Sequence, residues 1–454
     1  MSCLINYISL SDQIKSIDIS DISKDACKRG KNLEVHKDDY TLCINTCSKN
    51  QKTEQRLSVF EDKYIVNFEG YIDNLDELKK KLYKNNLRVQ TNKIALDAYL
   101  KWGSKAPNFM IGSYNFVIIN KQNRKIFCAR DHLGKKPFFY FYNGEIFVSG
   151  SEPKFIFKFN CLKKELNDAY LENFILQNKN CSSESYFKNI QKLKKAESLE
   201  ITRDGFHRFC YFEFKNHQQY EDATIEETSQ IFLDTFKEII DQQLNNSNEF
   251  ATHLSGGLDS SSVAMMLSHL NPDKRIDSYT YDFVMAKTND KFKVDEKKYA
   301  LDVINKGRFN PHFIRLEYDG IFERLINDQS LFPEPITHFN RYLELAVIKK
   351  CKEDNIDTVF TGFDGDTVVS YGQELIQKKF SENKIFEAIS LYKKSMKNTQ
   401  KKAKPIKLFT RYYLLKNLPQ SLHMLYKKTI GITGAGGSLG KALTKKFRSY
   451  GYKV

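Results

Sequence analysis

Long apolar runs are missing from this chain of 454 residues. No segment approaches the roughly 20 consecutive apolar residues that a membrane-spanning helix needs. The opening, MSCLINYISLSDQIKSIDIS, also lacks the basic start and apolar stretch of a secretory signal. With 41% hydrophobic and 28% charged residues, the composition is that of a globular protein and excludes a disordered or collagen-like chain. We therefore expect a cytoplasmic protein that does not use a membrane.

Paired cysteines are also missing, because no C-x2-C occurs among the nine cysteines. Cys43 and Cys47 are four residues apart, but no His or second Cys pair follows at the spacing of a zinc site. An odd, scattered set is typical of reduced thiols in a reducing compartment. The cysteines stand at positions 3, 27, 43, 47, 128, 161, 181, 210 and 351.

Acidic residues are outnumbered, 56 against 71 basic ones, which gives a formal net charge of +15. An excess of this size is a reason to consider nucleic-acid binding. The lysines are spread over the whole length, however, and only residues 393–407 form a run of one sign. Aromatic residues do not interleave with that run as they do on a base-stacking surface. We interpret the charge as solvated surface and expect no nucleic-acid partner.

The first half of the chain predicts a mixed α+β domain of mainly antiparallel sheet, over residues 1–214. Asn143-Gly144 stands between two aromatic-rich runs and predicts a hairpin turn. Helical patterns at 75–84 and 92–102 interrupt the strands. The expected strands include 63–70, 111–119, 126–130, 137–142 and 145–149.

A different sequence pattern follows the polar linker at 215–223. Thr224 and Glu227 form a capping box, and strands then alternate with helices, which predicts an α/β domain with a doubly wound parallel sheet over 224–428. Ligands of such sheets bind at the carboxyl ends of the strands. A third segment, 429–454, has a strand and a glycine-rich turn. The expected strands of the second domain are 250–254, 276–281, 312–317 and 356–362.

The segment between the first of these strands and its helix has the features of a phosphate-binding loop. Paired glycines let the backbone approach an anion closely, and the first N–H groups of the helix have no partner within it. Asp259 would repel a bare pyrophosphate, so its presence implies a magnesium ion between them. No Lys of the G-x4-G-K-[ST] type is present, which disfavours a kinase or an ordinary P-loop ATPase. The loop is Ser255-Gly256-Gly257-Leu258-Asp259-Ser260-Ser261.

A second acidic loop, Thr361-Gly362-Phe363-Asp364-Gly365-Asp366-Thr367, follows the strand at 356–362. Alone it is equally compatible with an Asx turn. Because neighbouring strands of a parallel sheet end at the same crevice, Asp366 is placed to share a metal ion with Asp259.

The order of these motifs resembles the glutamine-dependent asparagine synthetases and their relatives, the β-lactam synthetases and lasso-peptide cyclases. Segments 68–82, 91–103, 111–141 and 148–157 are similar to the family's class II glutamine amidotransferase domain, an Ntn-type fold with an α/β/β/α sandwich. LSGGLDSSSVA and TGFDGD match the family's two metal–pyrophosphate motifs, with Thr367 in place of the usual Glu. The similarity covers about residues 55–372.

The resemblance implies a ligase that adenylates a carboxylate with ATP, releases pyrophosphate and lets a nitrogen nucleophile displace AMP. Aspartate is the family's default acid, and ammonia or an amine is the nucleophile. By similarity, Leu254 and the Ser255–Ser261 loop hold ATP, Tyr281 lies at the adenine end, and Thr361-Gly362 flank the nucleotide. Mg²⁺ would bind between Asp259 and Asp366.

The N-terminal half departs from the family pattern. Members that hydrolyse glutamine carry Cys directly after the initiator Met, so that the freed α-amine serves as base. Here Ser2 follows Met1, and Cys3 is out of position for a terminal nucleophile. Lys28-Arg29-Gly30 remains of the family's arginine-glycine loop, and Glu69-Gly70 replaces the Asn-Gly that holds glutamine. We expect a degenerate, structural amidotransferase domain, with free ammonia or a substrate amine as the nitrogen source.

The C-terminal part departs further. The R-x-P-F-L-D stretch and the lysine that the family places after the second loop are not found after residue 372. Residues 429–454 instead resemble the first strand and T-G-x-x-G-x-x-G turn of short-chain dehydrogenases, and such a fragment is too small to bind NAD. This pattern predicts a truncated synthetase. Three alternatives stay open: an intramolecular amide-forming cyclase, a catalytically impaired remnant, and a tRNA-modifying enzyme suggested by charge alone.

Overall fold

A computed structural model describes most of the chain up to residue 398. The described residues are 2–14, 17–47, 56–84, 89–176, 183–202, 205–214, 223–282, 296–315, 334, 341–365 and 373–398. None of the helices in these ranges combines the length and the apolar character that crossing a bilayer requires. The glycine-rich segment 429–454 and most of the basic run 393–407 lie outside them.

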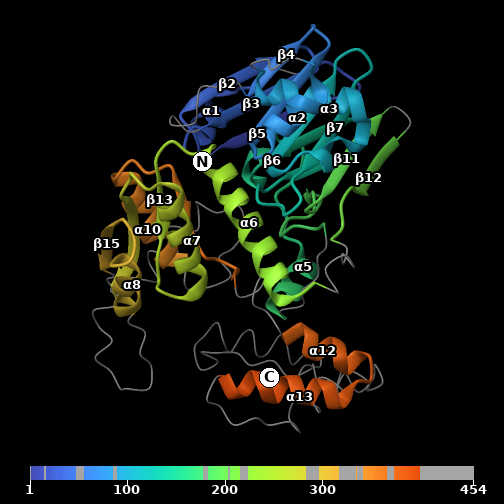
Figure 1. Ribbon diagram of the computed structural model, residues 1–454. Coiled ribbons are helices and arrows are strands. Elements are labelled where there is room, and N and C mark those ends of the chain that lie inside the picture. Colours follow the sequence, from blue (N-terminus) through green and yellow to red (C-terminus); the bar gives the residue numbers. More distant parts are fainter. Residues whose placement is uncertain are drawn as a thin grey trace, which may run out of the picture. The chain divides into compact units, whose positions relative to one another are not determined.

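Two six-stranded antiparallel sheets form the N-terminal half (Figure 1). The first sheet has the order β10 (Gln191–Lys192), β8 (Phe139–Tyr142), β9 (Ile146–Gly150), β1 (Cys3–Ser9), β3 (Thr41–Cys47) and β2 (Asn32–Lys37). The second has the order β12 (Gly205–Cys210), β11 (Glu197–Thr202), β7 (Lys125–Arg130), β6 (Gly112–Asn120), β5 (Tyr64–Ile72) and β4 (Leu57–Phe60).

Three apolar layers hold these sheets and their helices together. Side chains of both sheets, among them Leu4, Phe147 and Val117, form the layer between them. The outer face of the second sheet is covered by α2 (Leu75–Leu82) and α3 (Thr91–Trp102), as Figure 1 shows. The outer face of the first sheet packs against α1 (Ser20–Ala26) and α4 (Pro153–Phe157). The predicted α/β/β/α sandwich is therefore confirmed.

Local signals placed several of these elements correctly. β8 and β9 form the predicted hairpin, in which Gly144 has φ +95° and the Asn143 side chain accepts bonds from the N–H groups of Glu145 and Ile146. The two predicted helices correspond to α2 and α3. A short helix, α5 (Asp168–Ile175), and a 3-10 turn, η1 (Gly103–Phe109), complete this half.

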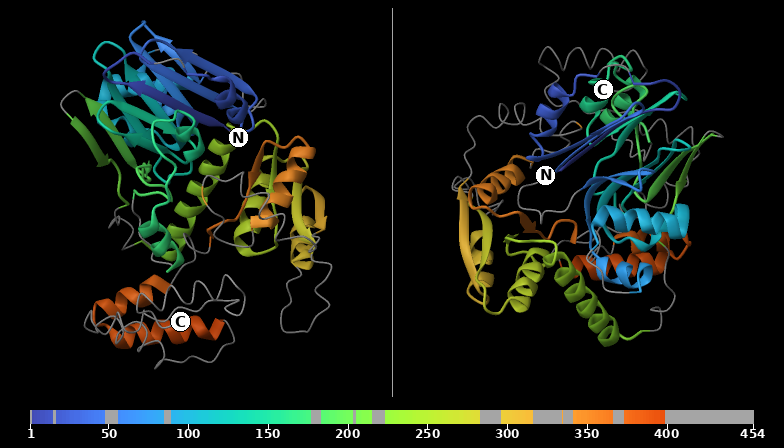
Figure 2. Two further views of the ribbon diagram at one scale, coloured as in Figure 1. Left: turned by 180° about the vertical axis from the view of Figure 1, so that it is seen from behind. Right: turned by 90° about the horizontal axis from the view of Figure 1, so that it is seen from above.

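The second half contains a four-stranded parallel sheet in the order β15 (Phe309–Arg315), β14 (Ile276–Asp282), β13 (Phe250–His253) and β16 (Thr358–Phe360). The helices α6 (Ile225–Leu244), α7 (Leu258–Leu270) and α8 (Lys297–Ile304) pack on one face, and α10 (Arg341–Glu353) packs on the other (Figure 2). This arrangement confirms the predicted doubly wound α/β sheet.

One strand begins earlier than the sequence pattern predicts. β15 starts at Phe309 rather than at His312 and therefore includes Pro311, which pairs in register with Ser278. Proline has no N–H to donate to a neighbouring strand, and it is tolerated here because β15 is the outermost strand of the sheet among the described residues.

The contacts of the chain divide it into Met1–Gly362 and Phe363–Val454. In the described part of the second unit, α12 (Gln373–Ser381) and α13 (Ile385–Asn398) pack together. Their contact is built on Ile376, Phe380 and Ala388.

The start of α6 allows a direct test of its cap. The Thr224 Oγ1 accepts a hydrogen bond from the Glu227 N–H at 3.2 Å, and the Glu227 Oε2 accepts one from the Thr224 N–H at 2.9 Å. We expect Thr224→Ala to lower the free energy of unfolding by about 1 kcal/mol. Urea unfolding followed by circular dichroism measures this. Thr235→Ala, an exposed site on the same helix, should not destabilise the protein, and equal losses in both variants would refute the cap assignment.

Candidate functional site

The phosphate loop lies at the carboxyl end of β13, directly before α7. Within it, the Ser260 Oγ accepts a hydrogen bond from the Ser255 N–H at 3.2 Å and lies 2.9 Å from the Ser255 Oγ. The Gly257 N–H donates to the Ser255 Oγ at 3.3 Å. These hydrogen bonds to Ser255 and Ser260 stabilise a tight turn. The first N–H groups of α7, which have no partner within the helix, then face the end of the sheet.

Close packing requires glycine at two positions of the predicted site. Gly256 has φ +82°, and a Cβ there would lie 2.4 Å from the Tyr299 backbone at the start of α8. A Cβ on Gly362 would lie 2.3 Å from the Ser260 nitrogen and 2.7 Å from the Asp259 carbonyl carbon. The end of β16 therefore touches the first turn of α7. Gly362, predicted from the second loop, lies directly beside Asp259 and Ser260.

The other residues that were predicted to bind the nucleotide lie in different environments. Leu254 is fully buried and is held by β14, because its N–H donates to the Tyr279 carbonyl at 2.9 Å and its carbonyl accepts from the Thr280 Oγ1 at 2.7 Å. Tyr281 is buried near the end of β14, whereas Leu258 is 87% exposed. The Ser261 Oγ is buried and has no hydrogen-bond partner within the part of the chain that the structure describes.

Asp259 is the acidic residue in the first turn of α7. A partly exposed carboxylate beside free helix N–H groups offers the hard oxygen donor that Mg²⁺ prefers, so this residue fits the implied metal. Asp366, its predicted partner, lies outside the described residues. Within those residues no three His, Cys, Asp or Glu side chains converge on a metal position.

The N-terminal half brings charged groups together around Ser2. Side chains alternate along β1, so Ser2 and Leu4 face the second sheet while Cys3 faces α1 and α4. The Ser2 Oγ donates a hydrogen bond to the Glu69 Oε1 at 3.1 Å. Cys3 is 0% exposed, and burial followed by the charge of Glu69 raises the pKa of its thiol well above its ordinary value. A thiolate nucleophile at Cys3 is therefore disfavoured.

The comparisons with known proteins agree with this geometry. The family model described as glutamine amidotransferase domain matches residues 41–212, and the model described as asparagine synthase matches residues 232–432. Asparagine synthetase [glutamine-hydrolyzing] 3 of Bacillus subtilis is 29% identical over 238 residues, 51% of this chain and 38% of that protein. The two halves of the chain are therefore similar to a glutamine amidotransferase domain and to asparagine synthase. A putative asparagine synthetase [glutamine-hydrolyzing] 2 of Methanocaldococcus jannaschii is 27% identical over 67% of this chain and 58% of its own length.

The chain thus spans about two fifths to three fifths of the length of these two asparagine synthetases. Among solved structures, the allosteric regulatory enzyme of purine biosynthesis has 12% sequence identity and a TM-score of 0.31, over 69% of this chain and 74% of that one. The similarity to asparagine synthetases depends on the two domain matches and not on this likeness.

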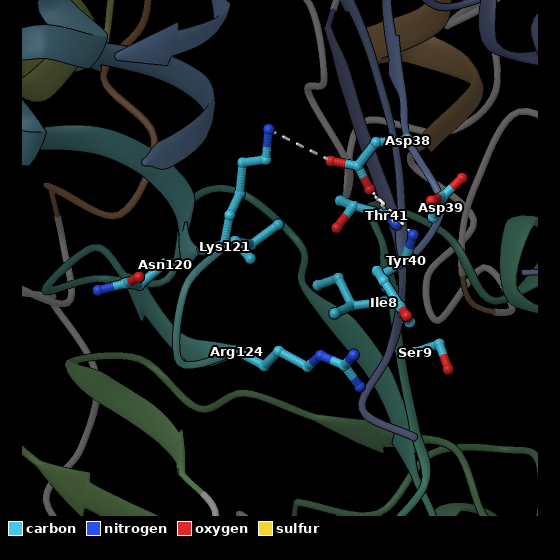
Figure 3. A pocket seen from close by; sticks show the side chains of 10 residues that line it. Ile8, Ser9, Asp38, Asp39, Tyr40, Thr41, Asn120, Lys121 and Arg124 are labelled. Atoms are coloured by element: carbon cyan, nitrogen blue, oxygen red, sulfur yellow. Dashed lines mark hydrogen bonds and ion pairs between the residues drawn. The ribbon is translucent and has the colours of Figure 1, made fainter. Parts of the chain in front are cut away.

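One cavity of about 340 Å³ lies in the amidotransferase half of this asparagine synthetase relative, at the end of β1 opposite Ser2 (Figure 3). Its charged groups bind neighbouring parts of the chain. Asp38 accepts hydrogen bonds from the N–H groups of Tyr40 and Thr41, and the Arg124 guanidinium lies 3.9 Å from the Tyr40 ring centroid. Arg124 also donates to the carbonyls of Leu10 and Ser11. We interpret these contacts as turn stabilisation.

The sequence analysis missed His253, the last residue of β13. Its ring lies 4.6 Å from that of Tyr281, and its buried Nε2 has no hydrogen-bond partner among the described residues. Burial lowers the pKa of His253, although the charge of Glu344 opposes that shift. The sequence signal for His253 was its place at the end of the strand, two positions before the phosphate loop.

Proposed function

We propose that this chain is an ATP-dependent ligase that forms an amide bond by adenylating a carboxylate. A carboxylate is a poor electrophile until one of its oxygens becomes part of a good leaving group. In the proposed reaction the acid attacks the α-phosphate of ATP, pyrophosphate departs, and a nitrogen nucleophile then displaces AMP. The family default, aspartate with ammonia, is the proposed substrate pair.

The packing of Gly362 against the first turn of α7 is the observation that carries the proposal. It supports a single crevice in which the Ser255–Ser261 loop binds the triphosphate through backbone N–H groups and hydroxyls. Leu254 and Tyr281 would bound the adenine side, and Thr361 and Gly362 would flank the ribose and phosphates. Mg²⁺ held by Asp259, with Asp366 as proposed second ligand, would offset charge on the departing pyrophosphate.

The nitrogen source follows from the N-terminal half. Ser2 stands in the site where glutamine-hydrolysing relatives need a thiol, and the nearby Cys3 is buried on the other face of β1. We therefore propose that free ammonia or an amine, and not glutamine, supplies the nitrogen.

Exchange of labelled pyrophosphate into ATP tests the adenylation step. We expect exchange only when a carboxylic acid substrate is present, with aspartate as the first acid to try and a panel of other acids beside it. The proposed function predicts that amide product forms with ammonium ion and not with glutamine at the same concentration. No exchange with any acid, under conditions in which ATP binding is measurable, would refute the ligase proposal.

A further inference from the structure

A buried carboxylate in the N-terminal half has both of its oxygens bound by hydroxyl groups. The Ser2 Oγ donates to the Glu69 Oε1 at 3.1 Å, and the Ser151 Oγ donates to the Glu69 Oε2 at 2.7 Å. Ser2 is 4% exposed, and Glu69 and Ser151 are each 1% exposed. Ser2 directly precedes β1, Glu69 lies in β5 and Ser151 directly follows β9, so the contact ties both sheets together.

Two cations contact Ser2, which is the neighbour of the same carboxylate. The Lys136 Nζ donates to the Ser2 Oγ at 3.3 Å, and the Arg29 Nε donates to the Ser2 carbonyl at 2.9 Å. Burial lowers the pKa of Arg29, but the charges of Glu69 and Glu152 raise it by more, so the guanidinium stays charged. Burial lowers the pKa of Lys136, and Glu69 is the main group that opposes this shift. Glu69 is therefore one of two counter-charges of this site, beside Glu152, whose Oε1 lies 2.6 Å from the Arg29 Nη1.

The backbone fixes Glu69 in this position. Gly70, the next residue, has φ +111°, and a Cβ there would lie 2.0 Å from the Ser113 carbonyl oxygen of β6. β5 pairs with β6 over its whole length, so Glu69 lies opposite Asn115 and cannot slide along the strand. The side chain is thus presented to Ser2 and Ser151 by a rigid pair of strands.

Hydroxyl donors and two cations around one carboxylate are the features of a binding site for a carboxylate ligand. Here the carboxylate belongs to the chain, at the position where the family resemblance puts the Asn that holds glutamine. We propose that Glu69 is a built-in ligand that fills the substrate site of the amidotransferase half and closes it to small molecules. No atom of the synthetase half takes part, so the inference stands or falls separately from ATP-dependent ligation.

Removing the Glu69 carboxylate should convert the cluster into an open carboxylate site. Glu69→Ala removes the main group that offsets the burial of Lys136 and leaves Arg29 paired with Glu152 alone, so we expect its melting temperature to fall on the order of 10 °C. Propionate, a small carboxylate that supplies the charged group missing from residue 69, should raise that temperature in a saturable way, and propionamide should not. The only Trp of the chain, Trp102, lies in α3 of the same half, so its fluorescence reports this unfolding transition in the full-length protein.

Three controls make the result decisive. The wild type and Glu145→Ala, an exposed glutamate of the β8–β9 turn, should show no propionate effect beyond that of an equal concentration of chloride. Glu69→Gln fills the space without the charge, so it should be destabilised and should not respond to propionate. Three outcomes would each overturn the proposal. They are equal responses to propionate in Glu69→Ala and Glu69→Gln, no response in either variant, and a saturable response of the wild type. If Glu69→Ala does not fold alone, the yield of folded protein after refolding with propionate is measured instead. A yield that does not depend on propionate would contradict the proposal.

Discussion

Asp259→Asn is expected to reduce the rate of pyrophosphate exchange by about 100-fold or more. Asn keeps the size of the side chain and its place in the first turn of α7, but it removes the negative charge that the proposed metal site needs. The loss should appear as a higher Mg²⁺ concentration for half-maximal exchange as well as a lower maximum. Exchange assays at several Mg²⁺ concentrations, with a fixed acid, measure both quantities.

A matched control separates this effect from a general change of charge. Asp273 is an exposed aspartate beyond the other end of α7, and Asp273→Asn should leave both the exchange rate and its Mg²⁺ dependence at wild-type values. If Asp259→Asn retained wild-type exchange, the proposed metal ligand would be wrong even if the chain is a ligase.

Gly256→Ala is expected to destabilise the synthetase half by about 3 kcal/mol or more. The new methyl group would stand 2.4 Å from the Tyr299 backbone, and the residue would have to keep φ near +82°. Both costs disappear only if the loop moves away from α8, so pyrophosphate exchange should fall together with stability. Circular dichroism during urea unfolding measures the loss, and a transition without a change in Trp102 fluorescence identifies the synthetase half.

The next glycine provides the comparison. Gly257 has an ordinary φ of −70°, and a Cβ there would meet only the Ser255 Oγ at 3.5 Å. Gly257→Ala should therefore cost well under half as much stability as Gly256→Ala. Equal stability losses in the two variants would contradict the packing argument.

The parts of this fold that depend on neighbouring residues were predictable. A few consecutive residues were enough to predict the Asn143-Gly144 hairpin, the Thr224 cap and the strand–loop–helix order around Asp259. What the structure adds to the sites is the set of contacts between distant segments. Gly362 meets Ser260, and Glu69 meets Ser2, only because strand order and register bring them together, and a single sequence does not encode either in a local pattern.

The predicted start of β15 was wrong for a physical reason. The predicted strand began at His312, whereas β15 begins at Phe309 and includes Pro311, because an outermost strand has one edge that needs no donor.

That same proline bears on self-association. An outer strand with a full row of free backbone groups is a template on which a second molecule can add a strand of its own. Because Pro311 removes an N–H from β15, the row is interrupted near its start, and a foreign strand laid along it would lose part of its bonding. In the part of the chain that the structure describes, this edge of the parallel sheet is in this way made less able to pair with another strand.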